Sequence, residues 1–120
     1  MLFRSDPVAA ASIAQVHRAK LRETGADVAV KVLRPGIEKA FRKDIDAFYL
    51  AAKMVDLLAP SARRLRPMDV IAHFEGGVLG ELDFRLESSA AAEFAANTAK
   101  DAGFQVPKPV WYLSDRKSVV

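Results

Sequence analysis

Residues 28–33 read Val-Ala-Val-Lys-Val-Leu, and this short, mostly β-branched run decides the fold of the chain. Turn-forming residues bound it on both sides, at 23–27 (Glu-Thr-Gly-Ala-Asp) and at 34–36 (Arg-Pro-Gly). Such a pattern is typical of a buried strand. A second candidate strand, 16–21, precedes the five-residue turn, so the two runs predict an antiparallel hairpin.

Beyond residue 36 the apolar spacing changes to three and four, which is the period of an amphipathic helix. Pro60 closes this helix, and a second helix begins near Pro67, because proline is favoured in a first helical turn. The second helical pattern continues to about Ala99. The first helix is expected to gather its apolar side chains on one face: Ile37, Phe41, Ile45, Phe48, Ala52 and Val55.

Three glycines interrupt the second helix, and each costs about 1 kcal/mol relative to alanine. We therefore expect a kink, a break or a close helix contact at these positions, which are Gly76, Gly77 and Gly80. After a stop at 101–103, the segment 106–109 is expected to be extended and a strand to begin at 110–113. The order β-β-α-α-β, with its last strand cut short, predicts an α+β fold.

The composition fits one domain, or part of one, because 51% of the 120 residues are apolar. The chain has no cysteine, which excludes disulfides, thiolate metal sites and cysteine nucleophiles. With only His17 and His73, a histidine-built zinc site is not expected. No apolar run approaches the roughly 20 residues that span a bilayer, and the first residues do not resemble a signal peptide.

The residues at the two ends of the sequence are predicted not to come from the protein's own gene. Residues 2–5, Leu-Phe-Arg-Ser, and 115–120, Asp-Arg-Lys-Ser-Val-Val, are what the two strands of a common short-read sequencing adapter encode. We therefore expect 1–5 and 115–120 to be translated adapter, and 6–114 to be an internal piece of a longer gene; a native start and a native tail are the alternative. Without these ends the chain has 15 basic and 14 acidic residues instead of 18 and 15, so its charge does not support nucleic-acid binding.

Two features near the predicted strands could contact a phosphate. Small residues at 9–12, Ala-Ala-Ala-Ser, would let backbone amides approach an anion, although a close-packed turn is the simpler explanation. Ser12 could also donate a hydrogen bond to a phosphate. Lys31 lies inside an apolar strand, and lysine is rarely buried without a partner. It lies either on the exposed face of an edge strand or beside a carboxylate that holds it toward a phosphate.

An acidic run at 81–87, Glu-Leu-Asp-Phe-Arg-Leu-Glu, is the third feature. Asp83 and Glu87 are four residues apart and would share a helix face, where like charges cost a few tenths of a kcal/mol. A nearby cation would remove that cost; Arg85 is expected on another face, whereas Lys31 is a candidate. A solvated acidic face is the plain alternative for such a run.

The ordered set of motifs resembles the UbiB family of atypical kinase-like proteins. Residues 9–19 are similar to that family's alanine-rich loop, and residues 28–37 to its lysine strand with the Arg-Pro-Gly that follows. Residues 81–87 are similar to its Glu-x-Asp motif and helix glutamate. The resemblance covers essentially all of 6–114. It implies a protein-kinase-like N-terminal lobe, with a truncated antiparallel sheet, a helical insert and helix C.

The resemblance also implies a role for each matching residue. Lys31 would bind the nucleotide phosphates, and Glu87 would pair with Lys31. Glu81 and Asp83 would belong to an acidic motif that closes the active site. Four small residues would lie over the nucleotide, where alanine in place of glycine restrains ordinary protein-kinase activity: Ala9, Ala10, Ala11 and Ser12.

The function that the resemblance implies is that of an ATP-binding atypical kinase or ATPase in ubiquinone biosynthesis. Its cofactors would be ATP and Mg²⁺, with the metal ligands outside this sequence, so the chain alone is expected to be inactive. Its partners would be isoprenoid lipid intermediates and ubiquinone-biosynthesis proteins, without nucleic acid. The full-length protein would contact the membrane, at the cytoplasmic face of the bacterial inner membrane. Two alternatives stay open: a kinase acting on a protein substrate, and a non-catalytic scaffold that binds lipids or partners and has a degenerate nucleotide pocket.

Overall fold

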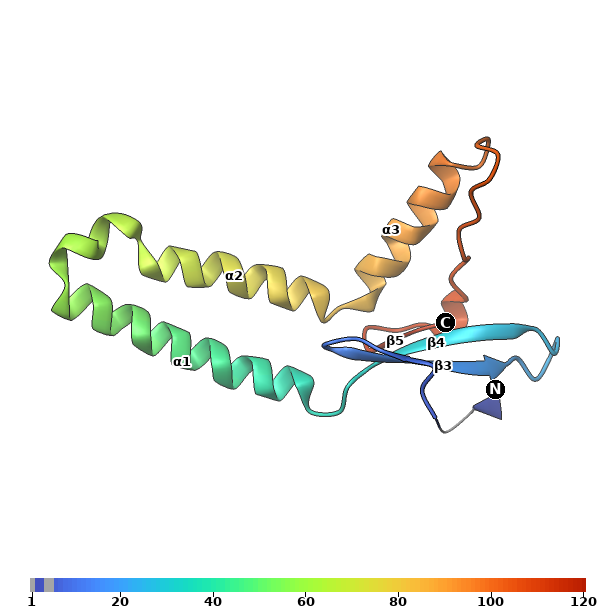
Figure 1. Ribbon diagram of the computed structural model, residues 1–120, viewed down its shortest axis with the longest axis horizontal. Coiled ribbons are helices and arrows are strands. Elements are labelled where there is room, and N and C mark those ends of the chain that lie inside the picture. The colour runs from blue at the N-terminus through green and yellow to red at the C-terminus, as the bar shows by residue number, and fades with distance from the viewer. Residues whose placement is uncertain (1, 4–5) are drawn as a thin grey trace. The chain divides into compact units, whose positions relative to one another are not determined.

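The computed structural model describes residues 2–3 and 6–120 and divides into two compact units. The first unit joins the residues up to 35 to those of 81–120, and the second unit spans 36–80. The first holds a sheet and one α-helix, and the second is a helical hairpin (Figure 1). An antiparallel sheet combined with helices confirms the predicted α+β class.

The sheet centres on two seven-residue antiparallel strands, β3 (Ala14–Lys20) and β4 (Asp27–Leu33). These strands form the predicted hairpin. Three two-residue strands extend the sheet: β1 (Leu2–Phe3) and β2 (Ala9–Ala10) pair with β3, and β5 (Ser118–Val119) pairs with β4.

The prediction that 28–33 is a buried strand holds only for Val30. Its side chain is 2% exposed and packs with Ala19 and Val120 in a small core. Alternate side chains of a strand point to opposite faces, so Lys31 lies on the other face of β4. The small core covers one face of this strand, and on the other face Lys31 lies against Phe84 of the helix Phe84–Asn97.

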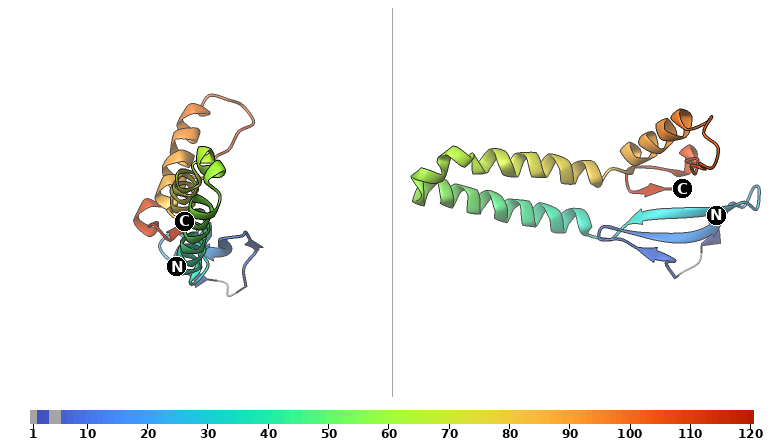
Figure 2. Two further views of the ribbon diagram at one scale, coloured as in Figure 1. Left: turned by 90° about the vertical axis from the view of Figure 1, so that its left-hand side faces the viewer. Right: turned by 45° about the horizontal axis from the view of Figure 1, so that its top comes forward.

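The second unit consists of α1 (Ile37–Leu58), the 3₁₀ helix η1 (Pro60–Leu65) and α2 (Pro67–Glu81). The helix starts near residues 37 and 67 were both predicted. Figures 1 and 2 show α1 and α2 side by side, joined through η1. Within the described residues, no helix combines the length and the apolar character that crossing a membrane requires.

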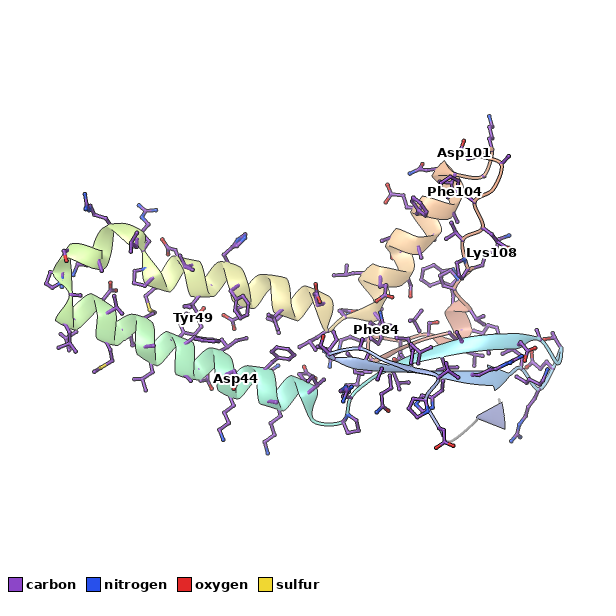
Figure 3. The ribbon with its side chains drawn as sticks, in the orientation of Figure 1. Asp44, Tyr49, Phe84, Asp101, Phe104 and Lys108 are labelled. Carbon is purple, nitrogen blue, oxygen red and sulfur yellow. The ribbon has the colours of Figure 1, made fainter. Side chains whose placement is uncertain are left out.

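Side-chain contacts connect α1 to α2. The Tyr49 hydroxyl donates a hydrogen bond of 2.7 Å to Glu75 Oε2, and Tyr49 points from α1 toward α2 in Figure 3. The rings of Phe48 and Phe74 meet edge to face, with centroids 6.0 Å apart. The predicted apolar face of α1 is nevertheless only partly covered, because Phe48 keeps 47% of its surface exposed.

The helical pattern predicted from Pro67 to about Ala99 is two helices, because α2 ends at Glu81 and α3 spans Phe84–Asn97. The break falls beyond the three glycines. Asp83 causes it, since its backbone is extended (φ −117°, ψ 97°) and its carboxylate accepts a hydrogen bond from the backbone N–H of Arg85. An aspartate in this geometry caps a helix N-terminus, so a new helix begins here.

The strand predicted at 110–113 does not form. A short 3₁₀ helix, η2 (Trp111–Leu113), takes its place, and the strand next to β4 is β5. The backbone N–H of Leu33 donates to the Lys117 carbonyl at 2.9 Å. Backbone pairing requires an extended segment but no particular side chains, so the pairing of β5 does not test where 115–120 come from. The adapter origin of these residues stays a prediction. Residues 1, 4 and 5 of the other predicted adapter end lie outside the described residues.

Candidate functional site

Lys31 in β4 and Glu87 in the first turn of α3 form a close ion pair. The Lys31 ammonium donates to Glu87 Oε1 at 2.8 Å and to Oε2 at 2.7 Å. The two side chains keep 30% and 49% of their surface exposed, so the pair alone adds little to stability. The structure therefore brings together the two residues that the family resemblance pairs, although they are far apart in sequence.

Phe84 lies beneath this ion pair and fixes its surroundings. Its side chain is 1% exposed, and the centroid of its ring is 4.9 Å from Lys31 Nζ, within the range of a cation–π contact. Figure 3 labels Phe84 at the start of α3. Sequence reasoning did not single out this residue; an aromatic side chain next to the capping Asp83 was the available signal.

A row of paired residues connects the alanine-rich loop to Lys31. Ala9 in β2 pairs with Val16 in β3, Val16 pairs with Lys31 in β4, and Lys31 pairs with Val119 in β5. Residues directly opposite each other in a sheet share a face. The start of the predicted loop thus lies on the same face as Lys31, about 10 Å away across two strand spacings.

Arg34 holds the turn of this loop, which the sequence did not reveal. Its Nε donates to the Ala11 carbonyl at 3.1 Å, and its backbone N–H donates to the Ile13 carbonyl at 2.9 Å. The turn itself is exposed over residues 9–12, including Ser12. The loop is therefore a tight hairpin whose small side chains face solvent.

A cavity of about 290 Å³ opens next to the ion pair. Val16 and Ala29 line it from the sheet, Ala91 lines it from α3, and residues 107–109 add a third wall. Lys31, Glu87 and Lys108 are the charged residues of its lining, whereas residues 9–12 are not part of it. The site is thus a mostly apolar cavity with the Lys31–Glu87 ion pair fixed at its wall and a second lysine, Lys108, on another wall.

The rest of the acidic run makes a separate contact. Arg85 NH2 lies 2.6 Å from Asp83 Oδ2, so the prediction that Arg85 lies on another helix face from Asp83 and Glu87 was wrong for Asp83. Asp83 is a helix cap, and this places its carboxylate beside the arginine two residues later. The Arg85 side-chain hydrogen bond holds the pKa of Asp83 below its ordinary value. Glu81 ends α2, is exposed, and takes part in neither ion pair.

Metal-ligating side chains do not gather in this part of the protein. Within residues 2–3 and 6–120, no group of three or more histidine, cysteine, aspartate or glutamate side chains is placed to hold a metal ion.

A lysine on a strand of an antiparallel sheet, in an ion pair with a glutamate on a helix, defines the N-terminal lobe of a kinase-like protein. The family model of the ABC1 atypical kinase-like domain matches residues 2–120, and the chain belongs to that family.

Curated relatives narrow the resemblance to one group and confirm the UbiB likeness predicted from the motifs. The probable protein kinase UbiB of Aliivibrio fischeri (strain MJ11) is 40% identical over 118 residues, which are 98% of this chain and 22% of the relative. The probable protein kinase UbiB of Vibrio cholerae serotype O1 is 42% identical over 106 residues, 88% of this chain and 20% of the relative. That of Cronobacter sakazakii is 41% identical over 106 residues, 88% of this chain and 19% of the relative. The chain spans about a fifth of the length of these relatives.

Proposed function

We propose that this chain is the nucleotide-binding part of an atypical kinase or ATPase that binds ATP with Mg²⁺. The observation that carries the proposal is the Lys31–Glu87 ion pair at the wall of the 290 Å³ cavity. A carboxylate that accepts from a lysine ammonium fixes its position, and a fixed ammonium is a phosphate-binding group.

The cavity also suits the nucleoside part of the ligand. Ligand sites are commonly apolar clefts of about 300–1,000 Å³ with a few fixed polar groups, and the volume of this cavity lies just below the lower end of that range. Val16, Ala29 and Ala91 are small or branched apolar residues, which leave room for a planar base between sheet and helix. In this proposal, the turn that contains residues 9–12 bends toward the phosphates and covers them. Other parts of the protein hold Mg²⁺.

The wider role that we propose is support of ubiquinone biosynthesis at the cytoplasmic face of the bacterial inner membrane. Its support is the UbiB name of the relatives and the family resemblance, with isoprenoid lipid intermediates and ubiquinone-biosynthesis proteins as partners. The chain spans about a fifth of those relatives, so we expect no ATP turnover from it alone. The paired Lys31 and Glu87 argue against a degenerate pocket, which a purely scaffolding function would permit.

Titration of the 120-residue chain with a fluorescent ATP analogue tests nucleotide binding. Lys31→Ala should weaken binding by about tenfold or more, because a charge-assisted hydrogen bond is worth roughly 1.5–3 kcal/mol. Lys39→Ala, which removes the same charge from α1, should bind as the unchanged chain does. Equal affinities for the unchanged chain and Lys31→Ala would overturn the proposal, provided that circular dichroism shows the same fold.

A further inference from the structure

The turn between α1 and α2 exposes large apolar side chains at one place. We call residues 57–66, which include η1, the hairpin tip. Leu57, Leu58 and Leu65 keep 71%, 70% and 75% of their surface exposed. Single exposed leucines are ordinary on a protein surface, whereas a group of them marks a place where something else binds.

The outer face of α1 continues this apolar group. Leu50 and Met54, which are 64% and 48% exposed, fall on the same side of the helix as Leu57, because a helix repeats every 3.6 residues. This side is opposite to Ile45 and Ala52, which are the buried residues of α1. Leu57 therefore does not belong to the contact between α1 and α2.

The charge of the hairpin tip is entirely positive. Residues 57–66 contain three arginines and no acidic residue. The Nε of Arg63 donates to the backbone carbonyl of Asp56 at 3.1 Å, which leaves its charge uncompensated. Among the residues that the structure describes, neither Arg63 nor Arg64 forms an ion pair, whereas Arg66 forms an exposed one with Asp69, at 3.7 Å.

Arg66 has an unusual backbone. It adopts a left-handed conformation (φ 46°, ψ 61°) and is the one non-glycine residue with positive φ in the described part of the chain. Glycine or asparagine fits this conformation more easily than arginine does.

We propose that the hairpin tip binds the surface of an anionic lipid bilayer. Its leucines would enter the boundary between headgroups and acyl chains, and Arg63, Arg64 and Arg66 would bind lipid phosphates. A protein partner is less well matched, because a stable protein interface needs roughly 20–30 residues on each side and the tip is one short turn. The hairpin has no membrane-spanning helix, so the contact is interfacial.

Vesicle sedimentation of the 120-residue chain tests this proposal. We expect binding to vesicles of phosphatidylglycerol mixed with phosphatidylcholine and weak binding to phosphatidylcholine alone. The double variant Arg63→Gln/Arg64→Gln should lower the partition coefficient by roughly 30-fold, because each basic residue near an anionic surface contributes about fivefold. The matched control Lys39→Gln/Lys43→Gln removes two charges from the other end of α1 and should bind as the unchanged chain does.

An apolar pair of variants separates insertion from simple charge attraction. Leu57→Ser/Leu58→Ser should weaken binding at least tenfold, whereas Val8→Ser/Phe104→Ser, which changes exposed apolar residues of the sheet unit, should not. The proposal would be overturned if the arginine and leucine variants of the tip bound vesicles as well as the unchanged chain does. It would also be overturned if the two control variants lost as much vesicle binding as the tip variants. The proposal would also fall if the unchanged chain bound no vesicles but self-associated, and Leu57→Ser/Leu58→Ser abolished the self-association. The tip would then bind a second copy of the chain.

A fluorescence measurement reports the depth of the tip directly. Trp111 is the chain's single tryptophan and lies in the sheet unit, so Leu58→Trp in a Trp111→Phe background places one reporter at the tip. Its emission should shift to shorter wavelength when anionic vesicles are added. Unshifted emission at saturating lipid would contradict insertion of the leucines.

Discussion

The sheet unit and the helical hairpin differ in how well their apolar residues are buried. In the sheet unit, the side chains of Val30, Leu82 and Phe84 are at most 2% exposed. In the hairpin only Ile45 and Ala52 are buried, and α2 contains no buried residue. The candidate nucleotide site lies in the well-packed unit, because an ion pair binds a phosphate only where its neighbours hold it in place. The hairpin instead keeps a large apolar surface available for contacts.

The largest difference between the units should appear when one aromatic residue is truncated in each. Phe84→Ala should lower the free energy of unfolding by about 3–5 kcal/mol, because it removes a fully buried ring and leaves a cavity. Phe74→Ala should cost much less, since Phe74 is 48% exposed. Urea unfolding followed by circular dichroism measures both, and equal losses would contradict the contrast in burial.

A change in the ion pair should affect ligand binding more than stability. Glu87→Gln should lower nucleotide affinity several-fold, because the ammonium of Lys31 loses its charged partner, while stability changes by less than about 1 kcal/mol, as for a partly exposed pair. Glu93→Gln, on an exposed position of α3, is the matched control for nucleotide titration and thermal unfolding. If Glu87→Gln lowered the melting temperature strongly but left the affinity of the folded chain unchanged, the pair would be structural.

Glycine replacements should strengthen the hairpin. Gly76→Ala and Gly77→Ala should each raise its stability by about 0.5–1 kcal/mol, because a Cβ at either position meets no atom within 4 Å and alanine favours a helix. Gly36→Ala should destabilise it, since Gly36 has a φ of 72°. Thermal unfolding measures the three variants, and a loss of stability in either α2 variant would show that the glycines serve a contact.

The smallest differences between the two units should appear in how their stability depends on pH, at acidic pH for the sheet unit and at alkaline pH for the hairpin. Arg85 lowers the pKa of Asp83 from 3.8 in the sheet unit, so the stability that this carboxylate contributes is present at neutral pH and lost as pH falls below about 4. The hydrogen bond to Glu75 raises the pKa of Tyr49 from 10.0 in the hairpin, so its contribution is lost as pH rises above about 10.

Two conservative variants isolate these contributions. Asp83→Asn should flatten the acid limb of the plot of melting temperature against pH, and Tyr49→Phe should flatten the alkaline limb. An unchanged acid limb in Asp83→Asn would assign acid sensitivity to another carboxylate, such as Asp27, whose pKa Lys20 and Arg18 lower.

Local pattern was enough to predict the β3–β4 hairpin, the helix from residue 37 and the start of another at Pro67, because periodicity and turn residues act over short distances. The partnership of Lys31 with Glu87 followed from the family resemblance. The break at Asp83 could not be predicted, since the apolar period continues through it and only the capping hydrogen bond shows that the backbone leaves the helix. The strand beside β4 was misplaced because pairing between distant segments depends on the whole sheet.

Contacts made by backbone atoms were also beyond the sequence. Arg34 binds the carbonyl of Ala11, which no pattern of residue types indicates. The burial of Phe84 depends on how α3 approaches the sheet. These two residues determine where the alanine-rich loop and the Lys31 ammonium lie.

Labelling with an acyl-phosphate derivative of ATP tests the central claim most directly, because such a probe acylates the lysine that lies beside the bound phosphates. Peptide mass spectrometry of the labelled chain should find Lys31 modified, with labelling suppressed by excess ATP and unaffected in a Lys39→Ala control. Labelling of Lys31 that excess ATP does not suppress, or modification spread evenly over exposed lysines such as Lys39 and Lys43, would contradict the nucleotide site. Preferential, ATP-sensitive labelling of Lys108 in place of Lys31 would contradict the phosphate-binding role of Lys31, because Lys108 lies on a different wall of the same cavity.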